Sequence, residues 1–214
     1  MERLGPFVKH LYIGGTTYNV DAVRKVLICC PNLIDFAFLS THQTIECIDL
    51  LEKLKLQRLF TNLSSLNEEH FKGSAFVYIT HLDITEFGGS WERWGWLQHI
   101  PQLTHVAVNG HIEGFDSAMQ LILKRCKKLE VLLLPRWPIH STDRLPNIRD
   151  HRFVRMAIQR YTVEGWEETA KGTQNNMWAC ATQISRARKG MFFFFGFLRV
   201  VRKLIRNDFN SGRI

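Results

Sequence analysis

The sequence predicts an α/β fold in which parallel strands are joined by helical segments, and three observations lead to this prediction. A six-residue pattern, apolar-x-x-apolar-x-apolar, recurs seven times at nearly constant spacing. The segments between the copies carry apolar residues at helical period. The chain has 214 residues, 45% hydrophobic and 22% charged, which is enough for one sizeable core. Together these features predict one folded domain followed by a tail.

The seven copies of the pattern are the predicted strands. Within each copy, the fourth and sixth residues lie on one face of the strand, and the third and fifth lie on the other. Successive copies start 25, 23, 23, 24, 26 and 24 residues apart. The copies are VKHLYI (8–13), LIDFAF (33–38), LQRLFT (56–61), ITHLDI (79–84), LTHVAV (103–108), LEVLLL (129–134) and FVRMAI (153–158).

The connecting segments are predicted to be helical, because apolar residues recur in them at intervals of three or four. These stripes span 22–30, 45–54, 91–97 and 115–126. The first and last stripes end in Cys30 and Cys126, each just before the next strand. A buried cysteine behaves as a small hydrophobic residue, so we expect both to be structural.

A strand and a helical return about every 24 residues are typical of a leucine-rich-repeat-like solenoid. We therefore expect about seven parallel strands on the concave side, helical returns on the convex side and a C-terminal helical cap. The asparagine expected three places after the last residue of each copy is replaced in all of them, so the repeat is degenerate. The predicted parts are the solenoid (1–160), a capping helix (161–190) and an apolar, then basic tail (191–214).

The charge distribution argues against a nucleic-acid partner. The net charge is +8, but residues 186–214 alone contribute +7, so the other 185 residues sum to +1. A nearly neutral body lacks the positive surface that phosphate binding requires. Five cysteines without a C-x-x-C pair, and no secretory signal, predict a reduced intracellular setting, in cytoplasm or nucleus.

The motifs of the common enzyme classes are missing from the sequence. There is no glycine-rich phosphate loop, no G-x-S-x-G and no H-E-x-x-H. The stretch 111–113 (HIE) matches the first half of the deaminase signature, but its P-C-x-x-C half is absent. We therefore expect a protein that is not an enzyme and that needs no cofactor.

The third and fifth strand residues point away from the predicted core, so they form the candidate binding surface. Neighbouring strands lie about 4.8 Å apart, so Asp35 is expected to face Arg58. The candidate residues on this concave face are His10, Tyr12, Asp35, Arg58, Phe60, His81, Asp83, His105 and Arg155. Such a mixed polar and aromatic surface suits a protein or peptide partner.

Three of these residues raise the question of a metal. His81, Asp83 and His105 are expected to cluster, and imidazole and carboxylate groups suit zinc. The alternative interpretation, a row of solvated strand residues, is the one we favour. The prediction is thus a surface without a metal.

Several motifs resemble those of a known group of proteins. They are CPNL (30–33), PQLTHV (101–106), CKKLEVL (126–132), DHRFVRM (150–156), WE (166–167) and WACA (178–181). In order and spacing, the chain resembles uncharacterised mushroom-type fungal proteins with degenerate leucine-rich repeats, many of them related to F-box proteins, over residues 8–190. The resemblance implies substrate recognition in a larger assembly. Only residues 1–7 precede the first strand, so the sequence contains no F-box to imply an adaptor role in ubiquitin ligation.

The functional prediction is therefore a protein–protein interaction module, with two alternatives. One is a peripheral membrane protein that uses 191–206, where a phenylalanine run precedes several basic residues. Residues 191–198 are too short to span a bilayer, which takes about 20 apolar residues. The other is a truncated, non-functional gene product, with the segment from Gly190 to Gly212 interpreted as a translated intron.

Overall fold

The computed structural model describes residues 3–14, 19–39, 44–109, 114–136, 148–157, 163–173 and 176–191. Its centre is one all-parallel sheet of seven strands, in the order in which they occur along the chain. The strands are β1 (His10–Gly14), β2 (Asp35–Leu39), β3 (Arg58–Asn62), β4 (His81–Glu86), β5 (His105–Val108), β6 (Val131–Arg136) and β7 (Phe153–Ala157). The predicted α/β class and the seven parallel strands are confirmed.

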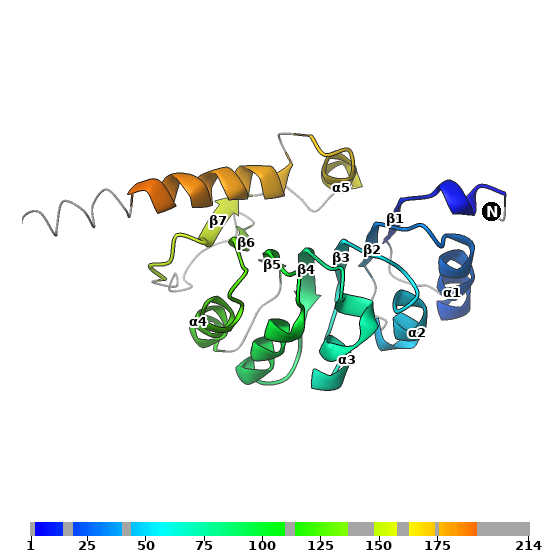
Figure 1. The fold of residues 1–214 in the computed structure, drawn as a ribbon, viewed down its shortest axis with the longest axis horizontal. Helices are drawn as coiled ribbons and strands as arrows, with labels where there is room; N and C mark the ends of the chain where they lie inside the picture. The colour runs from blue at the N-terminus through cyan, green and yellow to red at the C-terminus, as the bar shows by residue number, and fades with distance from the viewer. Residues whose placement is uncertain are drawn as a thin grey trace, which may run out of the picture.

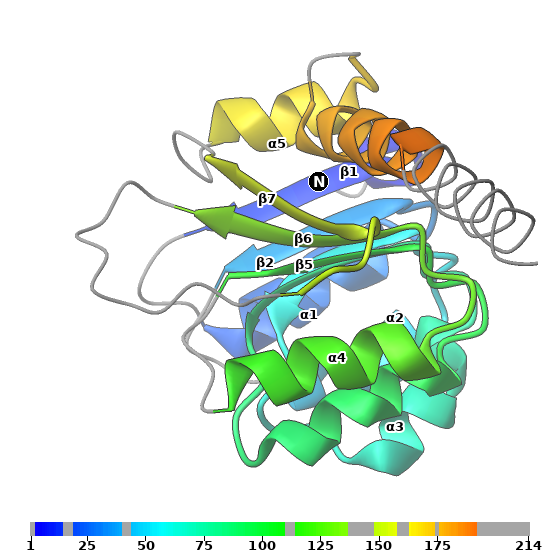
Figure 2. The ribbon, with the colours of Figure 1, turned by 90° about the vertical axis from the view of Figure 1, so that its left-hand side faces the viewer.

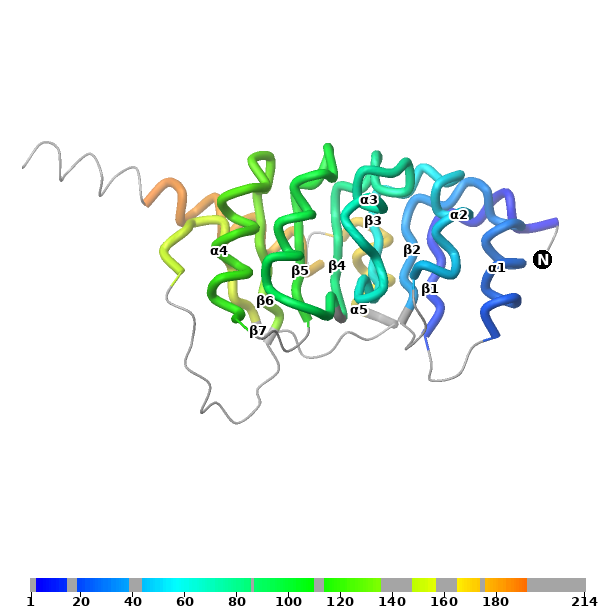
Figure 3. Tube along the Cα trace, turned by 90° about the horizontal axis from the view of Figure 1, so that it is seen from below, coloured from blue at the N-terminus to red at the C-terminus, as the bar shows by residue number. Residues whose placement is uncertain are grey.

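The described helices between β1 and β6 lie on one side of the sheet, which we call the near face (Figure 1). They include both α-helices and 3-10 helices (η), and the 3-10 helix η1 (Gly5–Phe7) precedes β1. The returns contain α1 (Val20–Cys29), η2 (Thr44–Cys47), α2 (Ile48–Leu51), α3 (Glu68–Lys72), η3 (Ser74–Phe76), η4 (Trp91–His99) and α4 (Phe115–Arg125). Figure 3 shows them side by side in chain order beneath the strands.

The main core lies between the near face and these returns. Alternate strand residues such as Phe36, Leu82 and Leu132 are at most 2% exposed. Helical residues such as Leu27 and Ile122 pack against the same core. Burying this apolar area, at about 25 cal/mol per Å², is the main favourable term in folding. From β1 to β6, the core-facing strand positions are therefore those that the six-residue pattern predicted.

The return before β5 differs in kind from a regular α-helix. The sequence predicted a helical stripe over 91–97, and the structure has the 3-10 helix η4 there. Residues three apart lie on the same side of a 3-10 helix, because it has three residues per turn. Trp94 and Leu97 are accordingly buried, whereas Trp91 is partly exposed. The spacing of three residues between Trp91, Trp94 and Leu97 therefore reflects the three residues per turn of a 3-10 helix.

The C-terminal segment takes a different course from the predicted single capping helix. It forms two helices, α5 (Val163–Ala170) and a helix over 177–191. Both lie across the side of the sheet opposite α1–α4, which we call the far face (Figures 1 and 2). The sheet is therefore the middle of three layers.

The pairing of the last strand corrects one prediction. Leu133 pairs with Val154, and Leu134 pairs with Arg155. The sequence pattern paired Val131 with Arg155 instead, a difference of three residues, and a slip by an odd number of residues moves every side chain to the opposite face. Val154 therefore lies on the far face and is fully buried, while Arg155 is exposed and lies on the other face. The prediction that Arg155 belongs to the candidate surface was wrong.

The tail lies beyond the part of the chain that the structure describes, apart from Met191 at its start. The membrane and intron alternatives, which concern residues 190–214, thus stay predictions, and the stretch 111–113 also falls outside. Within the described residues, no helix combines the length and the apolar character needed to cross a membrane.

The register of β7 can be tested by changing two neighbouring residues. Val154→Asp places a carboxylate in a fully buried site, so we expect the free energy of unfolding to fall by about 3 to 5 kcal/mol. Arg155→Asp changes an exposed side chain, so its effect should stay within about 0.5 kcal/mol. Urea unfolding followed by circular dichroism measures both. A larger loss from Arg155→Asp than from Val154→Asp would contradict the observed register.

The cysteines offer a second test of the core. Cys30, Cys47 and Cys126 are buried, as predicted for Cys30 and Cys126, whereas Cys29 and Cys180 are partly exposed. Burial raises the pKa of the buried thiols, and that of Cys126 to about 12. At pH 8 we expect a thiol reagent to label only Cys29 and Cys180 quickly, because the thiolate is the reactive form.

All five cysteines should react after unfolding in urea, which serves as the control. Mass spectrometry of labelled peptides identifies the positions. Labelling of Cys126 in the native protein at the rate of Cys180 would show that this part of the core is open.

Candidate interaction surface

The sheet register brings most of the predicted surface residues together. His10, Asp35, Arg58, His81 and His105 are register partners along β1–β5, as the sequence predicted. They form one row across the far face. This row is not an open surface, however, because α5 and the 177–191 helix lie over it (Figure 2). The contacts to these two helices divide the far face into two halves.

The N-terminal half of the far face is organised by a buried carboxylate. Asp35 is 2% exposed. Its Oδ2 accepts a hydrogen bond from Nδ1 of His10 at 2.5 Å, and its Oδ1 accepts one from Nε of Arg58 at 2.7 Å. Removing one partner from a buried ion pair is strongly destabilising, so Asp35 holds both side chains in place.

Arg58 and Tyr12 connect this half to α5. The Nη1 atom of Arg58 donates to the backbone carbonyl of Thr169 at 2.7 Å. The ring of Tyr12 lies 5.7 Å from that of Trp166, between ring centres, at an angle of 53°. Thr169 is 8% exposed as a result. Thus α5 rests on two predicted surface residues.

The arrangement of His10 also resembles an acid–base pair. Its Nδ1 is held by Asp35, and its side chain is 34% exposed. Within the described part of the chain, no serine, threonine or cysteine is hydrogen-bonded to its other ring nitrogen. The geometry therefore orients the imidazole without supplying it with a nucleophile.

At the middle of the far face, two histidines stack on each other. The rings of His81 and His105 lie 4.1 Å apart between centres, with planes only 9° from parallel. The ring of Trp178 lies nearly perpendicular to both, with its centre 5.2 Å from that of His81 and 5.7 Å from that of His105. These residues are thus packed beneath the 177–191 helix rather than presented to solvent.

Threonine hydroxyl groups lie beside both rings. Thr80 and Thr104 each donate to a backbone carbonyl of the preceding strand unit, both at 3.1 Å. Each hydroxyl lies within hydrogen-bonding distance of Nδ1 of the following histidine, at 2.9 Å for His81 and 2.8 Å for His105, and can accept from an Nδ1–H there.

The remaining nitrogen of His105 contacts the 177–191 helix. Its Nε2 lies 3.0 Å from the hydroxyl of Thr182. Burial lowers the pKa of His105 to about 4, assisted by Arg186 and opposed by Glu130. Burial, the neighbouring His105 and Arg58 lower the pKa of His81 to about 3. Both rings are therefore neutral at physiological pH.

The stacked geometry bears on the zinc alternative. Lone pairs of imidazole lie in the ring plane, so parallel stacked rings do not aim them at a common point. Asp83 is 5% exposed and accepts a hydrogen bond from Nδ2 of Asn109. In the described ranges, no three or more His, Cys, Asp or Glu side chains are grouped so as to hold a metal ion.

The C-terminal half of the far face is apolar. It is formed by Ala107, Val131, Leu133 and Val154, which pack against Trp178 and Ala181 of the 177–191 helix. The hydroxyl of Ser185 donates to the carbonyl of Glu130 at 3.0 Å, and Nη1 of Arg188 donates to that of Phe153 at 2.7 Å. The 177–191 helix therefore covers the C-terminal half of the far face, and the two form a second apolar cluster.

Sequence reasoning did not place the residues that cover the far face. These are Trp166 and Thr169 on the N-terminal half, and Trp178 and Thr182 on the C-terminal half. A signal was present, since Ala107, Val131 and Leu133 are apolar residues at third or fifth strand positions, which the sequence analysis expected to point away from the core. Phe60, another predicted surface residue, is also buried, at 8% exposure.

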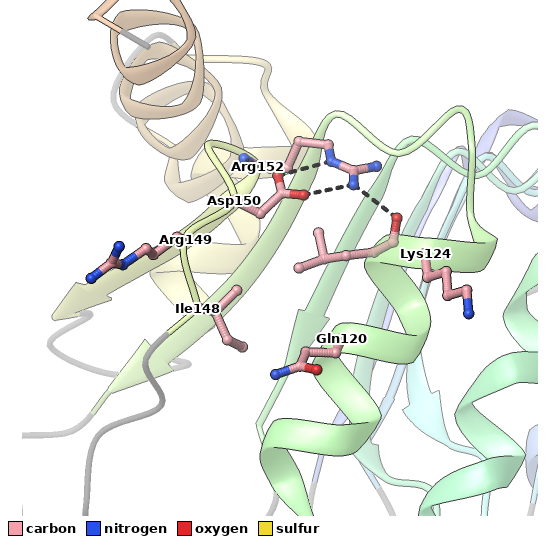
Figure 4. A pocket seen from close by; sticks show the side chains of 7 residues that line it. Gln120, Lys124, Ile148, Arg149, Asp150 and Arg152 are labelled. Carbon is pink, nitrogen blue, oxygen red and sulfur yellow. Dashed lines mark hydrogen bonds and ion pairs between the residues drawn. The ribbon is translucent and has the colours of Figure 1, made fainter. Parts of the chain in front are cut away.

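A shallow pocket of about 370 Å³ lies elsewhere, between α4 and the segment before β7 (Figure 4). The carboxylate of Asp150 is occupied by Arg152, which also donates to the carbonyl of Leu123. Arg149 and Lys124 also line the pocket, but their side chains point in different directions in Figure 4. The charges do not converge, so we assign no ligand to this pocket.

The buried histidines predict a dependence of stability on pH. Above pH 6.5, His81 and His105 are neutral in both the folded and the unfolded chain. As the pH falls, the unfolded chain takes up protons that the folded chain excludes until about pH 4 for His105 and about pH 3 for His81. Stability is thus lost from pH 6.5 downwards, and His105 alone should cost about 2 kcal/mol between pH 7.5 and pH 5.

Urea unfolding at these two pH values measures the effect. His81→Gln and His105→Gln, combined, should make the loss of stability smaller by the histidine contribution. Arg155→Gln, which changes an exposed side chain away from the far face that stays charged throughout this pH range, is the control and should leave the pH dependence as in the wild type. Equal pH dependence in the wild type and the double variant would show that the pair is not buried as described.

Comparison with known proteins identifies no relative that helps to interpret this surface. No family model, no curated protein and no solved structure matches the chain. The resemblance to fungal leucine-rich-repeat proteins therefore stays a prediction from sequence motifs, and the candidate surface is described by its own geometry alone.

Proposed function

We propose that this chain is a protein–protein interaction module with a leucine-rich-repeat-like solenoid form. The in-register parallel strands, with returns on the near face, support this proposal. In such an arrangement each unit contacts only its neighbours, and the stack offers an extended surface for a partner. Substrate recognition in a larger assembly is the role that we favour.

The observation that carries the proposal is the polar N-terminal half of the far face. There, a buried carboxylate holds Arg58 so that its guanidinium already engages a backbone carbonyl of another segment. A side chain that is fixed beforehand loses less conformational entropy on binding. We therefore assign the interaction surface to His10, Tyr12, Asp35 and Arg58, and treat His81, His105 and Phe60 as packing residues.

Affinity purification with the full chain as bait tests this assignment. Arg58→Lys keeps a charge beside Asp35 but lacks the planar fork of arginine, so it cannot serve Asp35 and a second acceptor in the same way. Combined with Tyr12→Ala, it should lower recovery of the specific partners at least fivefold, measured by quantitative mass spectrometry.

Arg155→Ala, on the other face of the sheet, is the matched control and should leave recovery unchanged. Thermal unfolding of each variant checks that the chain is still folded. The same set of partners recovered by the double variant and by wild type would contradict an interaction surface on β1–β3.

A further inference from the structure

The two helices on the far face are held in very different ways. The 177–191 helix buries Trp178 and Ala181 in an apolar cluster and makes several hydrogen bonds to strand segments. The contacts of α5 with the sheet include a hydrogen bond from Arg58 and a ring contact with Tyr12. No described side chain of α5 belongs to either apolar cluster.

The length and composition of α5 also make it weak by itself. It has eight residues. Isolated helices shorter than about 12 to 15 residues are marginal in water, and a glycine inside a helix costs about 1 kcal/mol relative to alanine. Gly165 lies within α5. The helix therefore depends on its docking to the sheet.

The contact with Arg58 has a clear physical character. Thr169 is the penultimate residue of α5, and its carbonyl accepts a hydrogen bond from the backbone N–H of Gly172, at 3.1 Å, as well as the one from Arg58. The C-terminal end of a helix carries a partial negative charge, which a cation stabilises. Arg58 thus binds a helix C-terminus, and Tyr12 contacts an aromatic ring three residues earlier, on the same side of the helix.

We propose that the β1–β3 part of the far face is a docking site for a short helix of a partner protein, and that α5 is an intramolecular occupant that competes with it. The partner helix carries an aromatic side chain three residues before a carbonyl at its C-terminal end. Arg58, held by Asp35, binds that carbonyl, and Tyr12 receives the ring. This inference rests on the proposed function and names the kind of partner.

A peptide with the sequence of residues 161–173 tests the site without any external partner. The full chain is prepared with its own α5 disabled by Trp166→Ala and Glu168→Pro, which remove the ring and break the helix. Fluorescence anisotropy of the labelled peptide should show at least tenfold tighter binding to this variant than to wild type, because in wild type α5 occupies the site.

Two controls make the result specific. Adding Arg58→Lys to the disabled chain should reduce peptide binding at least tenfold, and a peptide with Trp166→Ala should bind equally poorly. Arg155→Ala in the disabled chain should have no effect. Equal binding to wild type and the disabled chain, binding that does not depend on Arg58, or no binding to the disabled chain would each overturn the proposal.

Folding of the disabled chain is part of the test. We expect its circular dichroism and thermal transition to stay close to those of wild type, and the single variant Trp166→Ala to bind the peptide with intermediate affinity. Loss of folding in both variants would show that α5 belongs to the core and would also overturn the proposal. Specific peptide binding together with partner recovery that ignores Arg58 would retain the docking site and reject the proposed function.

Discussion

A parallel sheet needs cover on both faces, and this constraint determines how the chain is arranged. Each strand is joined to the next by a return that crosses one face, and here the described returns cross the near face. Returns that share one hand leave the other face to a later segment. Where the far-face residues are apolar, in β5–β7, the 177–191 helix supplies this cover. Where polar residues stand among them, in β1–β3, the cover is α5, which contacts Arg58 and Tyr12, and this difference divides the far face into two halves.

The polar half gains its specificity from one buried charge. Asp35 sits where water cannot solvate it, so it must keep its partners. Arg58 is thereby oriented before any helix arrives, with one nitrogen free to meet a carbonyl on the layer above. A surface arginine without such support would lose rotamer freedom on binding. The same residues that keep the sheet polar at this end therefore make it able to recognise the end of a helix.

Much of the sheet could be predicted because its repeat is local. The spacing of the apolar pattern located every strand to within two residues of its observed start and gave the correct register from β1 to β6. It failed at β7 because Phe153 and Val154 are both apolar, so the pattern alone cannot tell which residue faces the core. The covering of the far face could not be placed from periodicity, since α5 meets β1 and β3 across more than 100 residues of sequence. Ala107, Val131 and Leu133, the apolar residues at strand positions expected to be exposed, indicated only that some segment covers β5 and β6.

The stacked histidines His81 and His105 lie at the boundary between the two halves of the far face, which are covered by different helices. Trp178 packs against His81 and His105, so the part of the far face covered by the 177–191 helix extends to β4. The hydrogen bond and the ring contact of α5 lie outside this part of the far face, on β3 and β1 respectively. Leaving the sheet would break the hydrogen bond and the ring contact of α5, whereas the 177–191 helix would have to expose the buried Trp178 and uncover apolar residues of three strands. Because these costs differ so much, the N-terminal half can exchange one helix for another while the rest of the fold stays closed.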